Sequence, residues 1–500
     1  MNIRFFYLEG KYFKAFVGLT IFSVLYILPI ILANFYYIDD LGRSLRGYTG
    51  WNSNGRPLLS LLAIVFSDGK PLMDISPWIQ VVAGSIFNYS LVVYIRKYVD
   101  RASAFCIFYI AVFAYLNLFL LENFSYKYDS LGMFLSISLY FILFALPHSM
   151  NKKIVLIASV FAVILSSSLY QAAIGTYISL ALLEVLWNLY EQKDGNIISK
   201  EILIRVAGLL GGSLIYKLTV VKIYVKDGYS LEHAGMINIF SNEGIEKFVH
   251  NIHEFAFMFQ SYGMTIGVLG ILLLLILCVG LAYIAYVIWN RRDERKLLRI
   301  VSVGFVFVVP ILLVIASVIA LLLLESPVIA PRVMLSFTVF TLFIGFVLYR
   351  LSEIKKGFLA IAILSMICIL SFSSYYGNLL TSQEKTNHLV ASYIVHDMNE
   401  LEGKYGRDFD KVAFIGSSPH SHELSLAIKK RPLFSRLIPI YMNNDWYWGG
   451  QYLSHYRRKS VDLKKDNDDI QYINSIAPDQ KNEFYQIYVR DDKVIIAFRP

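Results

Sequence analysis

Two adjacent carboxylates follow the first long apolar run of the chain. Asp39 and Asp40 lie where a membrane-spanning helix leaves the bilayer, and a charge at that depth is costly unless it has a function. A carboxylate in this position is able to remove a proton from a hydroxyl as a general base. The pair is therefore the first candidate for chemistry in this sequence.

Three arginines follow the acidic pair. Arg43, Arg46 and Arg56 carry planar guanidinium groups, which hold phosphate through charge-assisted and often bidentate hydrogen bonds. Two simpler interpretations compete with a catalytic one. The segment is equally typical of a solvated loop whose aromatic residues form an interfacial belt, and the aspartates and arginines also fit a structural cluster of ion pairs.

The composition identifies the class of protein that must position these residues. Of the 500 residues, 56% are hydrophobic and 17% are charged, and the mean hydropathy is +0.54, which is too apolar for an ordinary soluble protein. The net charge of +9 comes mostly from short Lys and Arg clusters between apolar runs. Such clusters act as orientation signals, so we exclude a nucleic-acid partner. The three cysteines lie inside apolar runs and indicate neither a disulfide framework nor a metal motif.

Eleven apolar runs are predicted to span the membrane, with the N-terminus in the cytoplasm. The first run, about 16–35, follows Lys11 and Lys14, whose charge favours the cytoplasmic side. A run at 57–66 is too short to span and is predicted to be re-entrant or interfacial. The other predicted spans lie at about 75–95, 104–121, 131–146, 154–169, 172–189, 204–225, 264–289, 301–324, 333–349 and 358–375.

The composition changes to mixed-charge and soluble after Tyr376. We therefore predict a transmembrane domain over 1–376, with its first outer loop at 36–75, and a small α/β domain over 377–500 on the outer face. Within the second domain, KVAFIGSS is typical of a strand running into a turn, and FYQIYVRDDKVIIAF of a β-hairpin.

Other polar residues have weaker claims to function. The loop predicted over 226–263 contains His233, His250 and His253, but their spacing is not that of a metal site. Glu325 and Arg332 flank an outer turn between helices and are expected to cap or pair. In LENFSYKYDS, Lys127 and Asp129 fit a solvated loop better than a site.

These features together resemble the GT-C superfamily of polyprenyl-phosphate-sugar glycosyltransferases. The resemblance consists of an N-in polytopic chain, an adjacent acidic pair in the first outer loop and a soluble tail outside. The run IDDLGRSLRGYTGWNSNGRPL further resembles the bacterial and phage-encoded type-specific glucosyltransferases that modify O-antigen. The likeness in topology covers the whole chain, whereas the likeness in sequence covers only about 35–59.

The resemblance implies a reaction and roles for the site residues. A sugar, glucose by analogy, would pass with inversion from undecaprenyl phosphate to a hydroxyl of the O-antigen repeat of lipopolysaccharide, at the periplasmic face of the bacterial inner membrane. Asp39 or Asp40, with Asp40 preferred, would remove the acceptor proton. Arg43, Arg46 and Arg56 would bind the lipid phosphate as its charge grows. The residues implied to contact the sugar or the acceptor are Tyr48, Trp51, Glu122, Lys127, Tyr128 and Asp129.

The expected partners are therefore the lipid-linked donor, the glycan acceptor and the bilayer. No cofactor is predicted, and the need for a divalent metal stays open. One alternative function is a flippase or transporter for a lipid-linked saccharide, which predicts interrupted helices near mid-bilayer and two related halves; neither is clear in the sequence. Another is an O-antigen polymerase or ligase, against which the acidic pair beside the first helix argues.

Overall fold

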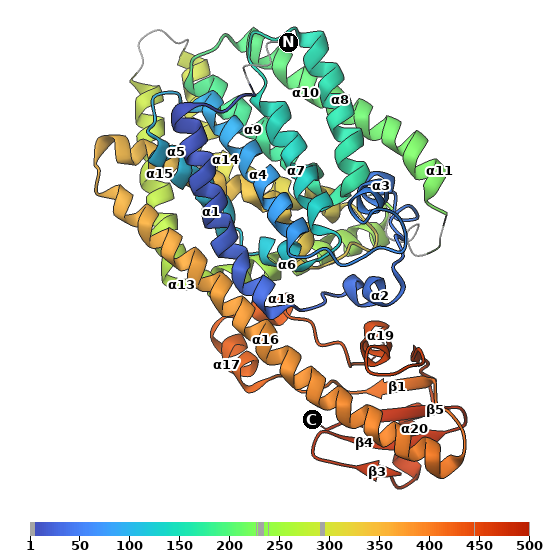
Figure 1. Ribbon diagram of the computed structural model, residues 1–500. Coiled ribbons are helices and arrows are strands. Elements are labelled where there is room, and N and C mark those ends of the chain that lie inside the picture. The colour runs from blue at the N-terminus through green and yellow to red at the C-terminus, as the bar shows by residue number, and fades with distance from the viewer. Residues whose placement is uncertain are drawn as a thin grey trace.

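The chain folds into a helical bundle with a small domain beyond one end of it (Figure 1). The computed structural model describes residues 6–226, 228, 235–238, 240–290, 296–444 and 446–499. Among these described residues, nine helices are long and apolar enough to cross a membrane, judged by length and composition. This architecture agrees with the polytopic membrane protein predicted from the composition.

The long helices of the bundle correspond to the predicted spans. The predicted third and fourth spans are the shorter apolar helices among them. The helices at the eleven predicted spans are α1 (Gly10–Ala33), α4 (Trp78–Tyr98), α5 (Ala104–Val112), α7 (Ser130–Ala145), α8 (Lys152–Leu169), α9 (Ile174–Tyr190), α10 (Gly195–Tyr216), α13 (Asn242–Trp289), α14 (Lys296–Leu322), α15 (Thr338–Ile354) and α16 (Phe358–Tyr405).

Short helices gather at the end of the bundle that faces the small domain (Figure 1). The predicted interfacial helix has the expected bounds, since α3 covers Pro57–Phe66. The other short elements of the bundle are α2 (Asp39–Arg46), η2 (Phe113–Leu116), α6 (Leu120–Ser125), η3 (Gln171–Ala173), η4 (Lys217–Val221), α11 (Lys222–Tyr224) and η5 (Pro331–Phe337).

Two predictions for the bundle are wrong. The predicted third span is interrupted after η2 because Asn117 turns its polar side chain inward, donating to the carbonyl of Met334 (3.2 Å) and to Oγ1 of Thr338 (3.0 Å). The predicted loop over 226–263 is helical from Asn242 on, and the chain turns at Gly267 (φ 52°) before the span continues. His233, which was assigned to this loop, lies outside the described residues.

The small domain, called the C-terminal domain below, is built on a five-stranded mixed sheet. The strands are β1 (Lys411–Ile415), β2 (Asp462–Leu463), β3 (Gln480–Lys481), β4 (Tyr485–Arg490) and β5 (Lys493–Phe498), in the order β2-β1-β5-β4-β3. β1 pairs parallel with β2 and β5, and β4 and β5 form the predicted antiparallel hairpin. The helices are α17 (His422–Lys430), α18 (Phe434–Leu437), α19 (Trp448–Ser454) and α20 (Asp469–Ser475).

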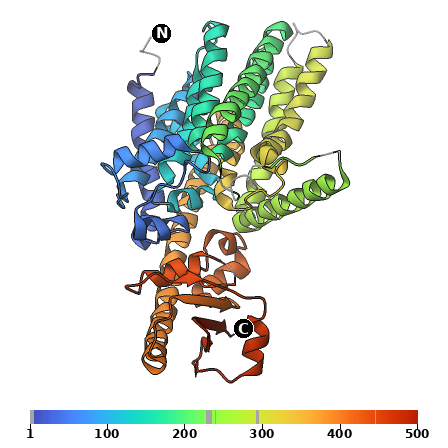
Figure 2. The ribbon, with the colours of Figure 1, turned by 90° about the vertical axis from the view of Figure 1, so that its right-hand side faces the viewer.

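Helix α16 connects the bundle to the C-terminal domain without a break (Figure 1), and Figure 2 shows the same two parts from the side. Its 48 residues extend over about 72 Å at 1.5 Å per residue, more than twice the roughly 30 Å of a bilayer core. Gly377 lets α16 cross α1 closely, because a Cβ there would lie 2.5 Å from Pro29. Buried apolar residues form one continuous cluster from the bundle into the domain, so the two parts pack as one body.

Candidate active site

The entry into α2 is the most strained segment near the acidic pair. Helix α1 ends at Asn34 in a left-handed conformation (φ 47°), and Ile38, the residue before α2, has φ 48° and ψ −101°. A positive φ at a β-branched residue is a genuine outlier. Such strain costs about 1–3 kcal/mol and tends to occur at functional sites, where the surrounding structure maintains it. The strained peptide leads directly into Asp39.

A tyrosine of the C-terminal domain holds this strained segment. The buried hydroxyl of Tyr441 accepts a hydrogen bond from the backbone N–H of Ile38 (3.1 Å) and donates one to the carbonyl of Tyr36 (2.7 Å). Its ring stacks on Phe35 with the centroids 5.6 Å apart. The C-terminal domain therefore helps to fix the backbone that carries the acidic pair.

Asp40 is fully buried and ties two loops together. Its Oδ2 accepts the backbone N–H groups of Lys127 (2.8 Å) and Tyr37 (3.2 Å), whereas Oδ1 has no hydrogen-bond partner among the described residues. Burial raises the pKa of Asp40 well above its ordinary value, although the N–H of Lys127 lowers it. Asp40 thus holds the segment before α7 against the start of α2.

Asp39 is more accessible than its neighbour. Its side chain is 39% exposed, and its Oδ2 lies 3.6 Å from Nη1 of Arg43. Burial raises the pKa of both Glu122 and Asp129, and the negative charge of Asp39 raises each of them further. The three carboxylates therefore share one electrostatic environment, in which only Asp39 has substantial exposure.

Asp129 joins Arg43 and Trp51 in a buried contact. Nη1 of Arg43 donates to Oδ2 of Asp129 at 2.8 Å, and the indole N–H of Trp51 donates to Oδ1 at 2.6 Å. The guanidinium group of Arg43 also lies 4.2 Å from the centre of the Trp51 ring. Asp129 is 2% exposed, so the alternative of a solvated loop at this residue is wrong.

Arg332 reaches the same place from η5, far along the chain. Its Nη1 donates to Oε1 of Glu122 (2.9 Å) and its backbone N–H to Oε2 (2.7 Å), so the expected pairing role of Arg332 is confirmed. Arg56 lies against Tyr170: its guanidinium group is 4.6 Å from that ring, while the Tyr170 hydroxyl donates to the backbone carbonyl of Arg332 (3.4 Å). The buried Tyr170 thus contacts the Arg56 guanidinium group and the Arg332 backbone.

Two further predicted residues face the C-terminal domain. Arg46 donates from Nη2 to the hydroxyl of Tyr447 and to Oε1 of Gln451, both at 2.8 Å, and so anchors α2 to the α19 region. The half-buried ring of Tyr48 lies 5.7 Å from the guanidinium groups of Arg43 and Arg46. Tyr48 is therefore an accessible aromatic ring beside the cluster.

The last two predicted residues lie deeper. Lys127 is 5% exposed, and its ammonium group donates to Asn34 Oδ1 (2.6 Å) and to Asp74 Oδ2 (3.1 Å). Tyr128 is 7% exposed and packs in an apolar cluster with Leu59 and other residues. Both support the loops and do not line an open surface.

The structure thus brings most of the predicted residues together and adds one that the sequence analysis did not assign to the site. We call Asp39, Arg43, Glu122, Asp129 and Arg332 the acidic–basic cluster. Arg332 was missed because it follows the predicted catalytic loop by almost 300 residues. The only signal in the sequence is an arginine directly after a proline, in a short polar segment between two apolar runs.

Several buried polar atoms in and around this cluster have no hydrogen-bond partner among the described residues. They are Asp40 Oδ1, Arg43 Nε, Asn123 Oδ1 and the Tyr126 hydroxyl. Buried polar groups in proteins almost always have partners. We therefore take these atoms as the places where polar groups of a ligand, or water, complete the site.

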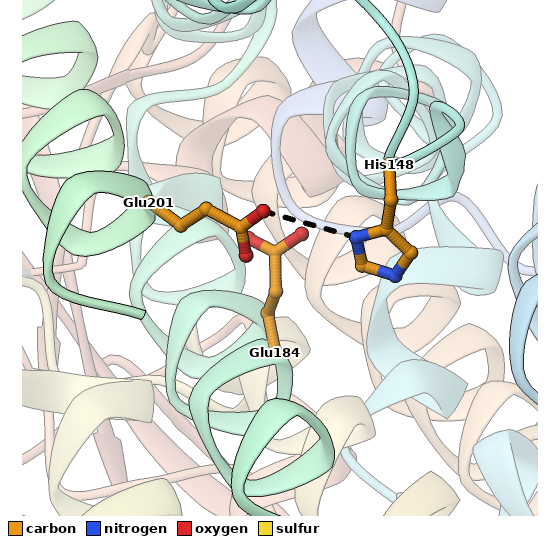
Figure 3. Close-up of side chains that lie close together, drawn as sticks. All are labelled: His148, Glu184 and Glu201. Carbon is orange, nitrogen blue, oxygen red and sulfur yellow. Dashed lines mark ion pairs between the residues drawn. The ribbon is translucent and has the colours of Figure 1, made fainter. Parts of the chain in front are cut away.

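A second group of titratable residues lies at the opposite end of the bundle. His148, Glu184 and Glu201 have ligand atoms within 4.8 Å of one another (Figure 3). Both oxygens of Glu184 accept from Arg205 (2.8 and 2.9 Å), and Lys152 donates to Glu201 at 2.7 Å. Because bound cationic side chains already neutralise these carboxylates, this group is an ion-pair network and offers a poor site for a metal ion.

Comparison with known proteins gives a family match and a similar curated protein. The family described as "Glucosyl transferase GtrII" matches residues 28–349, which include every residue of the acidic–basic cluster. A curated protein of Salmonella phage P22, described as "Uncharacterized 55.3 kDa protein in gtrB 5'region", is 27% identical over 505 residues, covering 97% of this chain and 98% of that protein. No solved structure matches.

Proposed function

The chain belongs to the GtrII glucosyl transferase family, which acts in O-antigen modification, and from this we propose a specific reaction. Glucose would pass from a polyprenyl phosphate donor to a hydroxyl of the O-antigen repeat, with inversion, on the periplasmic face of the inner membrane. The observation that carries the proposal is the half-exposed Asp39 set among arginines within the matched residues. The description of the phage protein, which refers to gtrB, agrees with this proposal.

We propose Asp39 as the general base. A base must reach the acceptor hydroxyl, and Asp39 is 39% exposed whereas Asp40 is fully buried. Asp40 is already bonded to two backbone N–H groups, and burial raises its pKa, which favours the neutral carboxyl. On these observations we favour Asp39 over Asp40, which the sequence analysis preferred. Asp40 then acts as a positioning residue.

For the donor phosphate we propose Arg56 and Arg332. Arg56 packs on the ring of Tyr170, whose hydroxyl donates to the Arg332 backbone, and both arginines are half-buried, so each keeps N–H groups for an anion. Planar guanidinium groups suit the oxygens of a phosphate whose charge grows as the glycosidic bond breaks. Arg43, bound to Asp129 and close to Asp39, would hold the base in place.

On the acceptor side we propose Tyr48 together with aromatic residues near α19. Tyr48 is half-buried, and Tyr447 of the C-terminal domain is 45% exposed beside Arg46. Exposed aromatic faces are suited to stacking on apolar faces of sugar rings. Residues 1–376 would then bind the donor, and residues 377–500 would cover the acceptor side from the periplasm. Trp51, which is 1% exposed, would support Asp129 without touching a sugar.

The proposal is tested by an assay with defined substrates. Membranes containing the full chain are incubated with polyprenyl phosphate glucose and an O-antigen acceptor, and the anomeric configuration of the product is determined by NMR. We expect Asp39→Asn to lower the rate by about 10²-fold or more. Asp68→Asn is the matched control, because Asp68 is an exposed acidic residue of the same loop. Unchanged transfer by Asp39→Asn would refute the assignment of Asp39 as the general base. Transfer from a nucleotide sugar, without transfer from polyprenyl phosphate glucose, would refute the proposed donor.

A further inference from the structure

A cavity lies between helices at the end of the bundle remote from the acidic–basic cluster. The space among its lining residues, including the part that is open to the surroundings, is about 540 Å³. Almost all of its lining is aromatic or aliphatic, from α4, α9, α13 and α15. The lining residues are Tyr94, Tyr98, Leu183, Leu186, Trp187, Tyr190, Ile284, Phe343, Phe346 and Arg350.

The lining follows from helical spacing. On α9, residues 183, 186, 187 and 190 form one stripe, and on α15 residues 343, 346 and 350 form another. Each stripe runs from the interior toward the end of its helix, over about 10 Å at 1.5 Å per residue. Leu183 and Phe343 at the inner end are buried, whereas Tyr190 and Arg350 at the outer end are half-buried. The cavity is therefore deepest inside the bundle and opens at its surface.

Among the described residues that line the cavity, only Arg350 is cationic. Its guanidinium group lies 5.3 Å from the Trp187 ring and 5.4 Å from the Tyr190 ring. Nη1 donates to Glu353 at 2.9 Å, which uses one of the five N–H groups of the side chain. A guanidinium group held between aromatic rings at the edge of an apolar cavity suits an anion joined to a hydrocarbon chain.

The environment of the cavity indicates which class of ligand it binds. The helices that form the cavity contain candidate membrane spans, so lipid surrounds them. Aromatic and arginine side chains at helix ends are typical of the membrane interface, where phosphate headgroups lie. We propose that the cavity binds one acyl chain of an anionic phospholipid whose phosphate is held by Arg350. With the predicted orientation, this lipid belongs to the cytoplasmic leaflet.

The site is independent of the proposed transfer reaction. It lies at the ends of α9 and α15, whereas Gln171 and Arg332, which precede these helices, belong to the region of the candidate active site. A lipid bound there would stabilise the packing of four helices without touching the donor or the acceptor. Its binding is therefore measured directly and not through activity.

Native mass spectrometry of the full chain, purified in detergent and stripped of lipid, tests the proposal. Phosphatidylglycerol and phosphatidylcholine with the same acyl chains are titrated separately. We expect one tightly bound phosphatidylglycerol, with phosphatidylcholine bound more weakly. Arg350→Gln is expected to weaken the binding of phosphatidylglycerol about tenfold, which is the effect of losing a charge-assisted hydrogen bond. Lys355→Gln is the matched control, because Lys355 is an exposed basic residue at the same end of the bundle. This variant should bind phosphatidylglycerol as tightly as the unaltered chain does.

A second pair of variants tests the cavity itself. Leu186→Trp on α9 and Ile284→Trp on α13 each place a larger side chain in the cavity from a different helix. If one variant does not fold, the other still tests the cavity. Both are expected to reduce the amount of either lipid that stays bound. A photoreactive phosphatidylglycerol should label α9 and α15 peptides that contain residues 183–190 and 343–350. Equal retention of the two lipids by the unaltered chain would overturn the role of Arg350. Undiminished binding by both filled variants, or labelling elsewhere, would overturn the site.

Discussion

Removal of the Tyr441 hydroxyl is the most informative perturbation of the candidate active site. In Tyr441→Phe the ring still stacks on Phe35, but the hydrogen bonds to the Ile38 N–H and the Tyr36 carbonyl are lost. Because those bonds hold Ile38 at φ 48°, we expect the segment to relax and Asp39 to leave its position beside Arg43.

The size of the effect follows from the bonds involved. Each neutral hydrogen bond contributes about 0.5–1.5 kcal/mol net, and a buried N–H left without a partner costs about 1–3 kcal/mol. The strain at Ile38 costs about 1–3 kcal/mol. This cost is comparable with the free energy of the two hydrogen bonds, so losing the bonds is enough to let the strained backbone relax. A shift of about 1–2 kcal/mol toward the relaxed segment lowers kcat/KM by about 5–30-fold.

The assay is glucosyl transfer by the detergent-purified chain, with thermal unfolding measured in parallel. Tyr488→Phe is the matched control, because that hydroxyl donates to Gln486 within the C-terminal domain, away from α2. Adding Ile38→Gly to Tyr441→Phe should restore part of the activity, since glycine adopts positive φ without steric cost. Activity within twofold of the unaltered chain, or no recovery in the double variant while both unfold normally, would refute the reasoning.

Three further predictions follow from individual contacts. Arg332→Lys keeps the charge but loses the planar fork, so the donor KM should rise about tenfold or more while the acceptor KM changes little; equal changes in both constants would argue against a phosphate role. Burial raises the pKa of Asp40 above the roughly 3.9 of an unfolded aspartate, so its stabilising contribution is full at low pH and is lost as pH rises through the folded pKa. The melting temperature of Asp40→Asn relative to the unaltered chain should therefore increase from pH 4 to pH 8, and a decrease would contradict the shift. Arg205→Ala leaves Glu184 buried without its main partner, which should cost about 3–5 kcal/mol in unfolding measurements, and Glu184→Gln added to it should recover part of the loss.

The sequence predicted the elements well where a single physical signal governed them. The bounds of α3 followed from an apolar run too short to span, and the β4–β5 hairpin from alternation around Asp491 and Asp492. Composition marked the change near Tyr376 but gave no sign that α16 continues through it, because the predicted span ended with its apolar run at 375. The early start of α13 was missed for a related reason: its exposed His and Glu residues lower the mean hydropathy, although the period remains helical.

The candidate site was predictable only in part, because the sequence shows which side chains are neighbours along the chain but not which are exposed. Asp39 and Asp40 are equivalent by type and position, yet one is half-exposed and the other is bonded to the N–H of Lys127 in another loop. Arg46 was grouped with the donor arginines by proximity, whereas its contacts are with Tyr447. Each of these differences depends on a contact between segments more than 80 residues apart.

Those long-range contacts also place the C-terminal domain against the candidate site, although the family match ends at residue 349. The strained peptide before Asp39 is bonded to Tyr441, and α2 is bonded to Tyr447 and Gln451. A strained backbone persists only where its surroundings hold it, so the geometry of the acidic pair depends on a domain that begins more than 300 residues later. A truncated chain that keeps residues 28–349 but lacks the C-terminal domain should therefore insert into the membrane and yet lose the active arrangement of Asp39.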